Sequence, residues 1–129
     1  MARPRADSPK VLEIRVGPPA DALDRFEAAW NRVAEGRKAL PLRILTLADL
    51  PAFIKTLTPA RWALVEDLRQ AGPCSIYELA RRLERDYKNV HTDVSQLLKL
   101  GMVERNESRV SVAWDVVRAE LRLHARFGL

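Results

Sequence analysis

Residues 58–105 read TPARWALVEDLRQAGPCSIYELARRLERDYKNVHTDVSQLLKLGMVER, and this stretch decides the fold. It holds three short amphipathic patterns, and each opens with a side chain that caps helix N-termini. Thr58 stands before a proline, which suits the first helical position, and Ser75 stands three positions before Glu78 as in a capping box. Asp86 opens the third pattern. The sequence therefore predicts three helices, over residues 59–71, 76–83 and 87–100.

Each predicted helix has an apolar stripe with the 3.6-residue period of a helix that packs on a core. The stripes are Trp62, Val65 and Leu68 with Leu64 at the edge, then Ile76, Leu79, Ala80 and Leu83, then Val90, Val94, Leu97 and Leu98. Two short strand patterns follow, at Met102–Arg105 and Arg109–Trp114, with a turn over residues 106–108. Three capped helices and a hairpin in this order predict a winged helix-turn-helix, a DNA-binding unit of the α+β class, over residues 58–114.

The first part of the chain has a different pattern. Val11–Val16 alternates apolar and charged residues, which predicts a half-buried strand. Three further elements follow: an amphipathic helix over residues 20–35, a strand over 42–46 and a short helix over 47–57. The start of the short helix has two interpretations, either a capping box from Thr46 to Asp49 or a later start at Asp49 before Pro51. We therefore predict a strand–helix–strand–helix extension over residues 11–57.

Two strands alone make a marginal sheet. The predicted strands either pair with each other under the helix, or a second chain completes the sheet, and the second alternative is a first indication of a homodimer. At the other end of the chain, Trp114, Val117 and Leu121 share one helical face, which predicts a C-terminal helix over residues 115–129. Residues 1–10 are basic with no apolar run after them, so we expect a flexible tail and no signal peptide.

Composition limits the classes of function. The 129 residues include 22 Lys and Arg against 17 Asp and Glu, a formal net charge of +5, which permits nucleic-acid binding without requiring it. The single cysteine, Cys74, allows no intrachain disulfide, suits a reducing cytoplasm and is expected to be a small buried residue. No apolar run suits a membrane span, and no Gly-rich phosphate loop, metal-ligand spacing or catalytic constellation occurs. We therefore expect a cytoplasmic protein that is not an enzyme and has no cofactor, metal or membrane partner.

The third predicted helix is the candidate for DNA contact. Opposite its apolar stripe it carries donors and amides, which match base edges and phosphates in a major groove: Lys88, Asn89, His91, Thr92, Ser95 and Lys99. Asp93 is the only carboxylate of this helix, whereas a solvated face usually mixes signs more evenly. The alternative interpretation is an ordinary polar helix face. Arg81 and Arg82, on the middle helix, either contact phosphates or pair with neighbouring carboxylates such as Glu78.

The predicted DNA contact set is Ser75, Arg85, Tyr87, Lys88, Asn89, His91, Thr92, Ser95, Arg105 and Arg109. Its centre is the N-terminal part of the third helix, which meets the bases in a helix-turn-helix. Arg85 is expected to contact a phosphate, and Arg105 and Arg109 to flank a wing tip beside the minor groove. Tyr87 either contacts DNA or packs on the turn, and His91, taken alone, is more typical of a surface or packing residue.

Residues 57–105 resemble the winged helix-turn-helix transcriptional regulators of bacteria and archaea, in the broad group that includes MarR-like proteins. The residues that carry the resemblance are SIYELARRL at 75–83, RDYKNVHTDV at 85–94 and LKLGMVER at 98–105. The second run is similar to a narrower subgroup of small predicted regulators, some of which act as antitoxins that repress their own toxin–antitoxin operon. The resemblance implies a prokaryotic, sequence-specific regulator of transcription that binds double-stranded DNA.

Two hypotheses follow. In the first, the protein is a repressor and a homodimer, with a dimer contact supplied by the first helix and by residues 114–127. In the second, it is an antitoxin whose N-terminal half binds a toxin protein, and its DNA binding regulates its own operon. A winged helix that contacts only proteins is disfavoured by the basic, acid-poor third helix. The N-terminal extension departs from MarR proteins, which begin with a long dimerisation helix.

Overall fold

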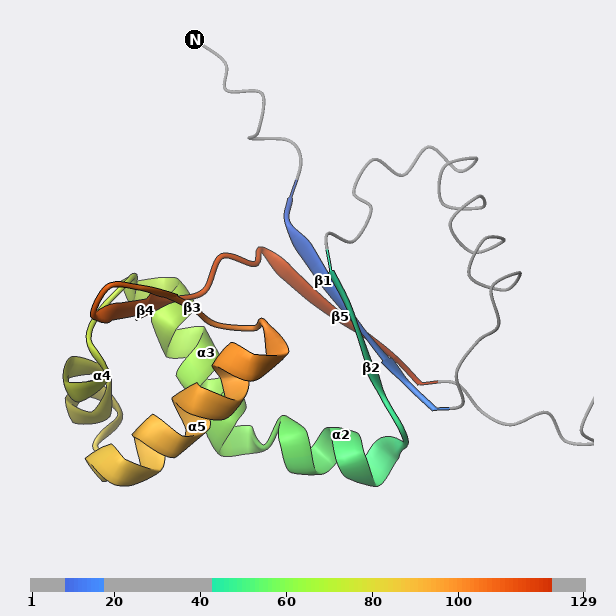
Figure 1. The fold of residues 1–129 in the computed structure, drawn as a ribbon, viewed down its shortest axis with the longest axis horizontal. Helices are drawn as coiled ribbons and strands as arrows, with labels where there is room; N and C mark the ends of the chain where they lie inside the picture. Colours follow the sequence, from blue (N-terminus) through green and yellow to red (C-terminus); the bar gives the residue numbers. More distant parts are fainter. Residues whose placement is uncertain (1–8, 18–42, 122–129) are drawn as a thin grey trace, which may run out of the picture. The chain divides into compact units, whose positions relative to one another are not determined.

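The computed structural model describes residues 9–17 and 43–121 of the chain (Figure 1). The chain divides into two compact units. The first consists of Met1–Ile54 together with Trp114–Leu129, and the second is Lys55–Ala113. The helix predicted over residues 20–35 lies outside the described residues, as does the chain after residue 121. Within the described ranges, no helix has the length and hydrophobicity that a membrane crossing requires.

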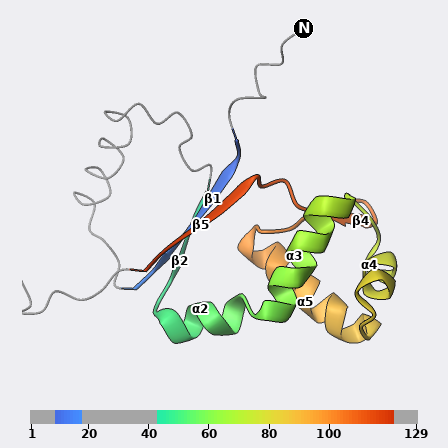
Figure 2. The same cartoon turned by 180° about the vertical axis from the view of Figure 1, so that it is seen from behind.

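The second unit begins with three capped helices, α3 (Pro59–Ala71), α4 (Ile76–Leu83) and α5 (Tyr87–Leu100) (Figures 1 and 2). Each cap side chain accepts a hydrogen bond from the backbone N–H three residues on: Thr58 at 3.2 Å, Ser75 at 3.1 Å and Asp86 at 3.3 Å. Gly101, with a φ of 82°, ends α5 in the left-handed region. Glu84 ends α4 in the same region, with a φ of 54°. The three predicted helices and their starts are confirmed.

The apolar stripes of these helices form the core of the second unit. Its buried side chains include Leu64, Val65, Leu68, Leu79, Val90, Val94 and Leu97. One assignment is reversed, because Leu64 is fully buried whereas Trp62, predicted for the core, is only half-buried. Leu64 and Leu68 lie one turn apart on the same helix face, so that edge of α3 faces the other helices.

A hairpin of β3 (Glu104–Asn106) and β4 (Arg109–Ser111) follows α5, and its strands pair antiparallel. Both strands are shorter than predicted, since Met102 and Val103 are buried core residues that precede the pairing. Val110 anchors the hairpin, because it is buried and exchanges two backbone hydrogen bonds with Cys74, at 3.1 and 2.8 Å. Three helices followed by a hairpin make the second unit winged-helix-like, within a mixed α and β structure.

The first unit contains a three-stranded sheet in the order β2–β1–β5. Its strands are β1 (Val11–Val16), β2 (Arg43–Leu47) and β5 (Val116–Leu121). Both outer strands run parallel to β1. The two strands predicted near the N-terminus therefore pair with each other, and the third strand comes from the far end of the same chain.

Residues 116–121 form a strand, so the prediction of a C-terminal helix over residues 115–129 is wrong for this segment. Val117 and Leu121 fit a helical face, but they also alternate with charged residues as in a strand. A segment of this length does not distinguish the two periods. The deciding contact is β1, which pairs along its whole length, from Val11 with Val116 to Val16 with Leu121.

Two element boundaries bear on the predictions. The start of the ordered chain differs from the prediction, and the start of α2 decides between two predicted alternatives. Lys10, assigned to the flexible tail, donates its backbone N–H to the Asp115 carboxylate at 2.8 Å, so the ordered chain begins before β1. Helix α2 (Leu50–Thr56) follows Asp49, whose carboxylate accepts the N–H of Ala52 at 2.9 Å. The later of the two starts proposed for this helix is therefore correct.

The strand register gives the sheet one mainly apolar face, on which Arg43 lies beside Leu12, and a second face, here called the charged face, which also carries Ile44 and Val116. Leu12, Ile14 and Val16 of β1 lie on the apolar face with Leu45, Leu47, Val117, Ala119 and Leu121. On the other face, Glu13 lies beside Arg118 of β5, and Arg15 lies beside Glu120. Glu13 is fully buried and accepts a hydrogen bond from Nε of Arg15 at 2.7 Å. The charged face therefore has acidic and basic side chains in alternation, both along β1 and across to β5.

Candidate nucleic-acid interface

Helix α5 is the last of the three helices of the winged-helix-like unit, and its first turns expose the predicted contact residues Tyr87, Lys88, Asn89, His91 and Thr92. Ser95, one turn further on, is half-buried. The rings of Tyr87 and His91 lie 5.9 Å apart between centroids, with an interplanar angle of 39°. The Thr92 hydroxyl donates to the Lys88 carbonyl at 3.1 Å, which orients it along the helix. The six side chains thus lie on α5 between residues 87 and 95, and all of them except Ser95 are exposed.

The only carboxylate of α5, that of Asp93, is bound from two sides. Arg61 of α3 donates through Nε to Oδ1 at 3.0 Å, and Arg85 donates through Nη2 to Oδ2 at 2.8 Å. The side chains of Asp93, Arg61 and Arg85 are 13, 18 and 27% exposed. Because each carboxylate oxygen is occupied by a guanidinium group, the outward face of α5 presents no unpaired acid.

The same ion-pair network pairs Arg85 with Asp93 inside the protein, and the phosphate contact of Arg85 stays a prediction. Its guanidinium lies on Asp93, and its Nη1 atom is buried without a hydrogen-bond partner in the described part of the chain. Arg85 ties the turn before α5 to the helix itself. Arg61 was not selected from the sequence, since 32 residues separate it from Asp93 and no local pattern signals the contact.

The arginines of α4 are paired with carboxylates. Arg81 lies 3.4 Å from Glu78 on the same helix, which is one of the predicted alternatives. Arg82 binds Asp67 of α3 through Nε at 3.0 Å and Nη2 at 2.6 Å, a partner that the sequence did not suggest. This hydrogen bond raises the pKa of Arg82 above its usual value. Arg82 therefore ties α4 to α3, and only Arg81, which is highly exposed, remains accessible to a phosphate.

The start of α4 adds one residue that the sequence analysis missed. Ser75 uses its hydroxyl oxygen as the cap of the helix, so its O–H remains as a donor. Tyr77, on the first turn, is 65% exposed. Tyrosine hydroxyls commonly contact phosphates, and α4 is the helix that crosses the backbone in a helix-turn-helix. An exposed aromatic residue in the first turn of this helix was the available signal.

The wing carries the two remaining predicted contacts, and the strand register separates them. Arg105 is opposite Val110, whereas Arg109 is opposite Asn106. Because side chains alternate along a strand, Arg105 lies on the face of the buried Val110 and Arg109 on the other face. Nε of Arg105 also donates to the carbonyl of Glu107 at 3.2 Å. Both arginines are exposed, but they do not form one cationic pair at the tip.

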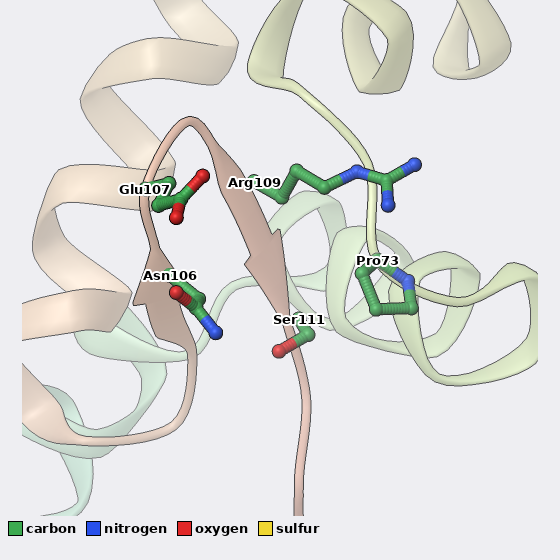
Figure 3. A pocket seen from close by; sticks show the side chains of 5 residues that line it. All are labelled: Pro73, Asn106, Glu107, Arg109 and Ser111. Atoms are coloured by element: carbon green, nitrogen blue, oxygen red, sulfur yellow. The ribbon is translucent and has the colours of Figure 1, made fainter.

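Arg109 lines a hollow of about 310 Å³ between the hairpin and the loop that joins α3 to α4 (Figure 3). The other lining residues are Pro73, Asn106, Glu107 and Ser111. In Figure 3 the Arg109 side chain extends from the hairpin toward the loop that carries Pro73. Glu107 places a carboxylate at the same hollow, so the hollow suits a phosphate less well than the acid-free face of α5 does.

Cys74 lies in the core beside the wing. Burial raises the pKa of its thiol above the usual 9.0, although the neighbouring Arg82 acts in the opposite direction. The thiol is therefore neutral near physiological pH and less nucleophilic than a free cysteine. The prediction that Cys74 is a small buried residue is confirmed.

Comparisons with known proteins found two similarities. The protein-family model HVO_A0114 matches residues 56–119, just under half of the chain. A crystal structure of a MarR-like transcriptional regulator from Thermotoga maritima is 23% identical, with a TM-score of 0.42. The alignment covers 73% of this chain and 66% of that one, so the chain spans just under two thirds of its length. No curated protein matches the chain.

Proposed function

We propose that this protein is a sequence-specific regulator of transcription that binds double-stranded DNA as a homodimer and acts as a repressor. One observation carries the proposal: the single carboxylate of α5 is held by two arginines. Within the helix itself, Lys88, Asn89, His91 and Thr92 are therefore exposed without an unpaired carboxylate among them, and the nearest acid is the N-cap Asp86.

In the proposed complex, the first turns of α5 enter the major groove. Lys88 donates to the O6 and N7 acceptors of guanine, and Asn89 pairs bidentately with adenine. Tyr87 and His91 add an aromatic edge to the same surface. The N-terminal end of a recognition helix meets the bases in this class of unit, which is the end where these side chains lie.

Contacts to the phosphates orient the protein on the duplex in this proposal. Ser75 and Tyr77, at the start of α4, are hydroxyl donors, and Arg105 and Arg109 supply the charges of the wing. Since the two wing arginines lie on opposite faces of the hairpin, each one contacts a different phosphate or groove edge. A dimer would read two half-sites about 10 bp apart, or a multiple of that spacing, and would exclude polymerase from a promoter that contains them.

The test measures specific DNA binding of the full chain. A binding site is selected from a random duplex library, and affinity is then measured by fluorescence anisotropy over a range of salt concentrations. The double variant Lys88→Ala/Asn89→Ala is expected to lose specific binding, with a salt slope smaller by about one for the lost lysine contact. The matched control Lys55→Ala/Gln70→Ala removes one lysine and one side-chain amide from exposed positions on α2 and α3, and should bind as the wild type does.

Two results would refute the proposed function. One is the absence of duplex binding by the wild type even at low salt, where the electrostatic contribution is largest. The other is unchanged binding by the Lys88→Ala/Asn89→Ala variant, which would remove α5 from the interface. Repression is tested by a reporter with the selected site in its promoter, and expression should fall with the wild type and not with the double variant.

A further inference from the structure

We infer that the outer edge of β5 pairs antiparallel with β5 of a second copy, and that this contact forms the homodimer. The inference rests on the homodimer of the proposed function and names its surface. Among the described residues, β5 pairs only with β1, so its other edge has no partner there. Five of its six residues are exposed, and only Val117 is half-buried. An uncovered strand edge is a template for pairing with another chain.

The backbone of β5 shows which groups face that open edge. Val116 donates its N–H to the Lys10 carbonyl at 3.1 Å, so its main-chain groups face β1. Main-chain direction alternates along a strand, which turns the N–H and C=O groups of Val117, Ala119 and Leu121 to the outer edge. A second strand is recognised through these three residues.

The side chains of β5 are complementary to themselves under two-fold symmetry. Its sequence, VVRAEL, places a cation and an anion symmetrically about Ala119. When two copies run antiparallel with Ala119 at the axis, Arg118 lies opposite the partner's Glu120, and Val117 lies opposite the partner's Leu121. The small Ala119 side chains meet at the two-fold axis, so they do not sterically hinder the two strands from pairing. The contact is isologous and closes after two copies.

The charged pairs of Arg118 with the partner's Glu120 occupy the positions at which facing side chains are closest. In this register Ala119 and Val117 form the hydrogen-bonded pairs, so Arg118 and the partner's Glu120 form non-hydrogen-bonded pairs. Side chains approach each other most closely at such positions, with Cα atoms about 4.5 Å apart. No ion pair of Arg118 or Glu120 is formed within the described part of the chain, which leaves both available for the pairing.

The same register extends the alternation of acidic and basic side chains that β1 and β5 already form within one chain. On the charged face, Glu13 lies beside Arg118 and Arg15 beside Glu120. Pairing of the two β5 strands extends this row to Glu13, Arg118, the partner's Glu120 and the partner's Arg15, which alternates in sign across four strands. A shift of the register by two residues would place Arg118 opposite itself, so the charges also select one register.

The outer edge of β2 is the other strand edge of this sheet that could pair with a second copy, but its sequence is less complementary to itself. The N–H of Gly17 donates to the Leu47 carbonyl at 3.1 Å, so the main-chain groups of Ile44 and Thr46 face the β2 edge. Self-pairing of β2 about its centre would place Arg43 opposite Leu47, without charge complementarity. We therefore assign the contact to β5, and the β2 edge supplies the control.

The first test uses proline, which removes one N–H from a strand edge. Ala119→Pro removes an outward N–H of β5 without breaking a bond to β1, and Thr46→Pro does the same at the β2 edge. Sedimentation of the full chain should show a dimer for the wild type and for Thr46→Pro, and a monomer for Ala119→Pro. A wild type that is monomeric at all concentrations, or a dimer that survives Ala119→Pro, overturns the inference.

The second test keeps the inference falsifiable if Ala119→Pro fails to fold. Arg118→Glu and Glu120→Arg each place like charges opposite each other twice in a homodimer, and each should weaken dimerisation by about tenfold. A mixture of the two variants restores both opposite-charge pairs, so the mixed dimer should form with nearly wild-type affinity. Failure of the mixture to dimerise, with thermal unfolding of both variants intact, would contradict the β5 contact.

The outcomes also separate this inference from the proposed function. If Lys88→Ala/Asn89→Ala dimerises normally while DNA binding is absent from all forms, the β5 contact stands and the proposed function falls. If Ala119→Pro remains a dimer while the wild type binds DNA specifically, the function stands and the β5 contact falls.

Discussion

The substitution Asp93→Ala tests the ion-pair network in which Arg61 and Arg85 bind the only carboxylate of α5. It removes the carboxylate acceptor of Arg61 and of Arg85, at positions that are 18 and 27% exposed, while Nη1 of Arg61 still donates to the Thr56 carbonyl at 2.9 Å. Loss of one partner from a fully buried pair costs roughly 3–5 kcal/mol, and a hydrogen bond to a charged group contributes about 1.5–3 kcal/mol. With the discount for partial exposure, we expect the second unit to lose about 2–4 kcal/mol of unfolding free energy.

The assay is urea denaturation of the full chain, followed by a double-mutant cycle with Arg85→Met. Because Asp93 and Arg85 are 2.8 Å apart, their substitutions should be coupled by at least about 1 kcal/mol. The control Glu66→Ala removes an exposed carboxylate from α3 and should change stability by less than about 0.5 kcal/mol. A loss below about 1 kcal/mol for Asp93→Ala, or additive losses in the cycle, would refute the reasoning.

Three further predictions concern the second unit. Glu84 and Glu107 have φ values of 54° and 60°, so glycine at either position should stabilise the protein by about 0.5–1 kcal/mol in thermal unfolding, whereas Ser108→Gly should not. Ser75→Ala removes the cap of α4 and should cost about 1 kcal/mol, and Ser75→Asp should recover most of it. Burial raises the pKa of Cys74, so its neutral thiol favours the folded state below the usual 9.0, and that contribution is lost as pH rises through the raised value. Alkylation of Cys74 at mildly alkaline pH should accordingly be much slower in the native protein than in urea, and equal rates would contradict its burial.

The features predicted correctly from the sequence depend on near neighbours along the chain. Caps at Thr58, Ser75 and Asp86 each act on an N–H three residues away, so a short window contains both partners. Apolar periodicity likewise places most of the helical core. The exposed end of α5 follows from the same pattern, because residues opposite a buried stripe face outward.

The features that the sequence did not reveal depend on partners that are distant along the chain, or on the exact number of residues in a loop. Asp93 meets Arg61 across 32 residues, and the strand over 116–121 is defined by pairing with residues 11–16. The wing shows how a change of one residue in loop length exchanges the two faces of a strand. Asn106 pairs with Arg109, so the loop has two residues and not the three predicted, and this count decides which faces the wing arginines occupy.

The parallel pairing of β1 with β5 also has a consequence for biosynthesis. The partners Lys10 and Asp115 are 105 residues apart, so the sheet of the first unit cannot close until the whole winged-helix-like unit has been synthesised. That unit is contiguous in sequence, Lys55–Ala113, so all of its residues are synthesised before β1 can meet its partner β5. A nascent chain would therefore possess α5, the helix proposed to contact DNA, before it possesses the β5 edge proposed to join two copies. The ability to pair as a dimer would then be acquired last, and only by chains completed through β5.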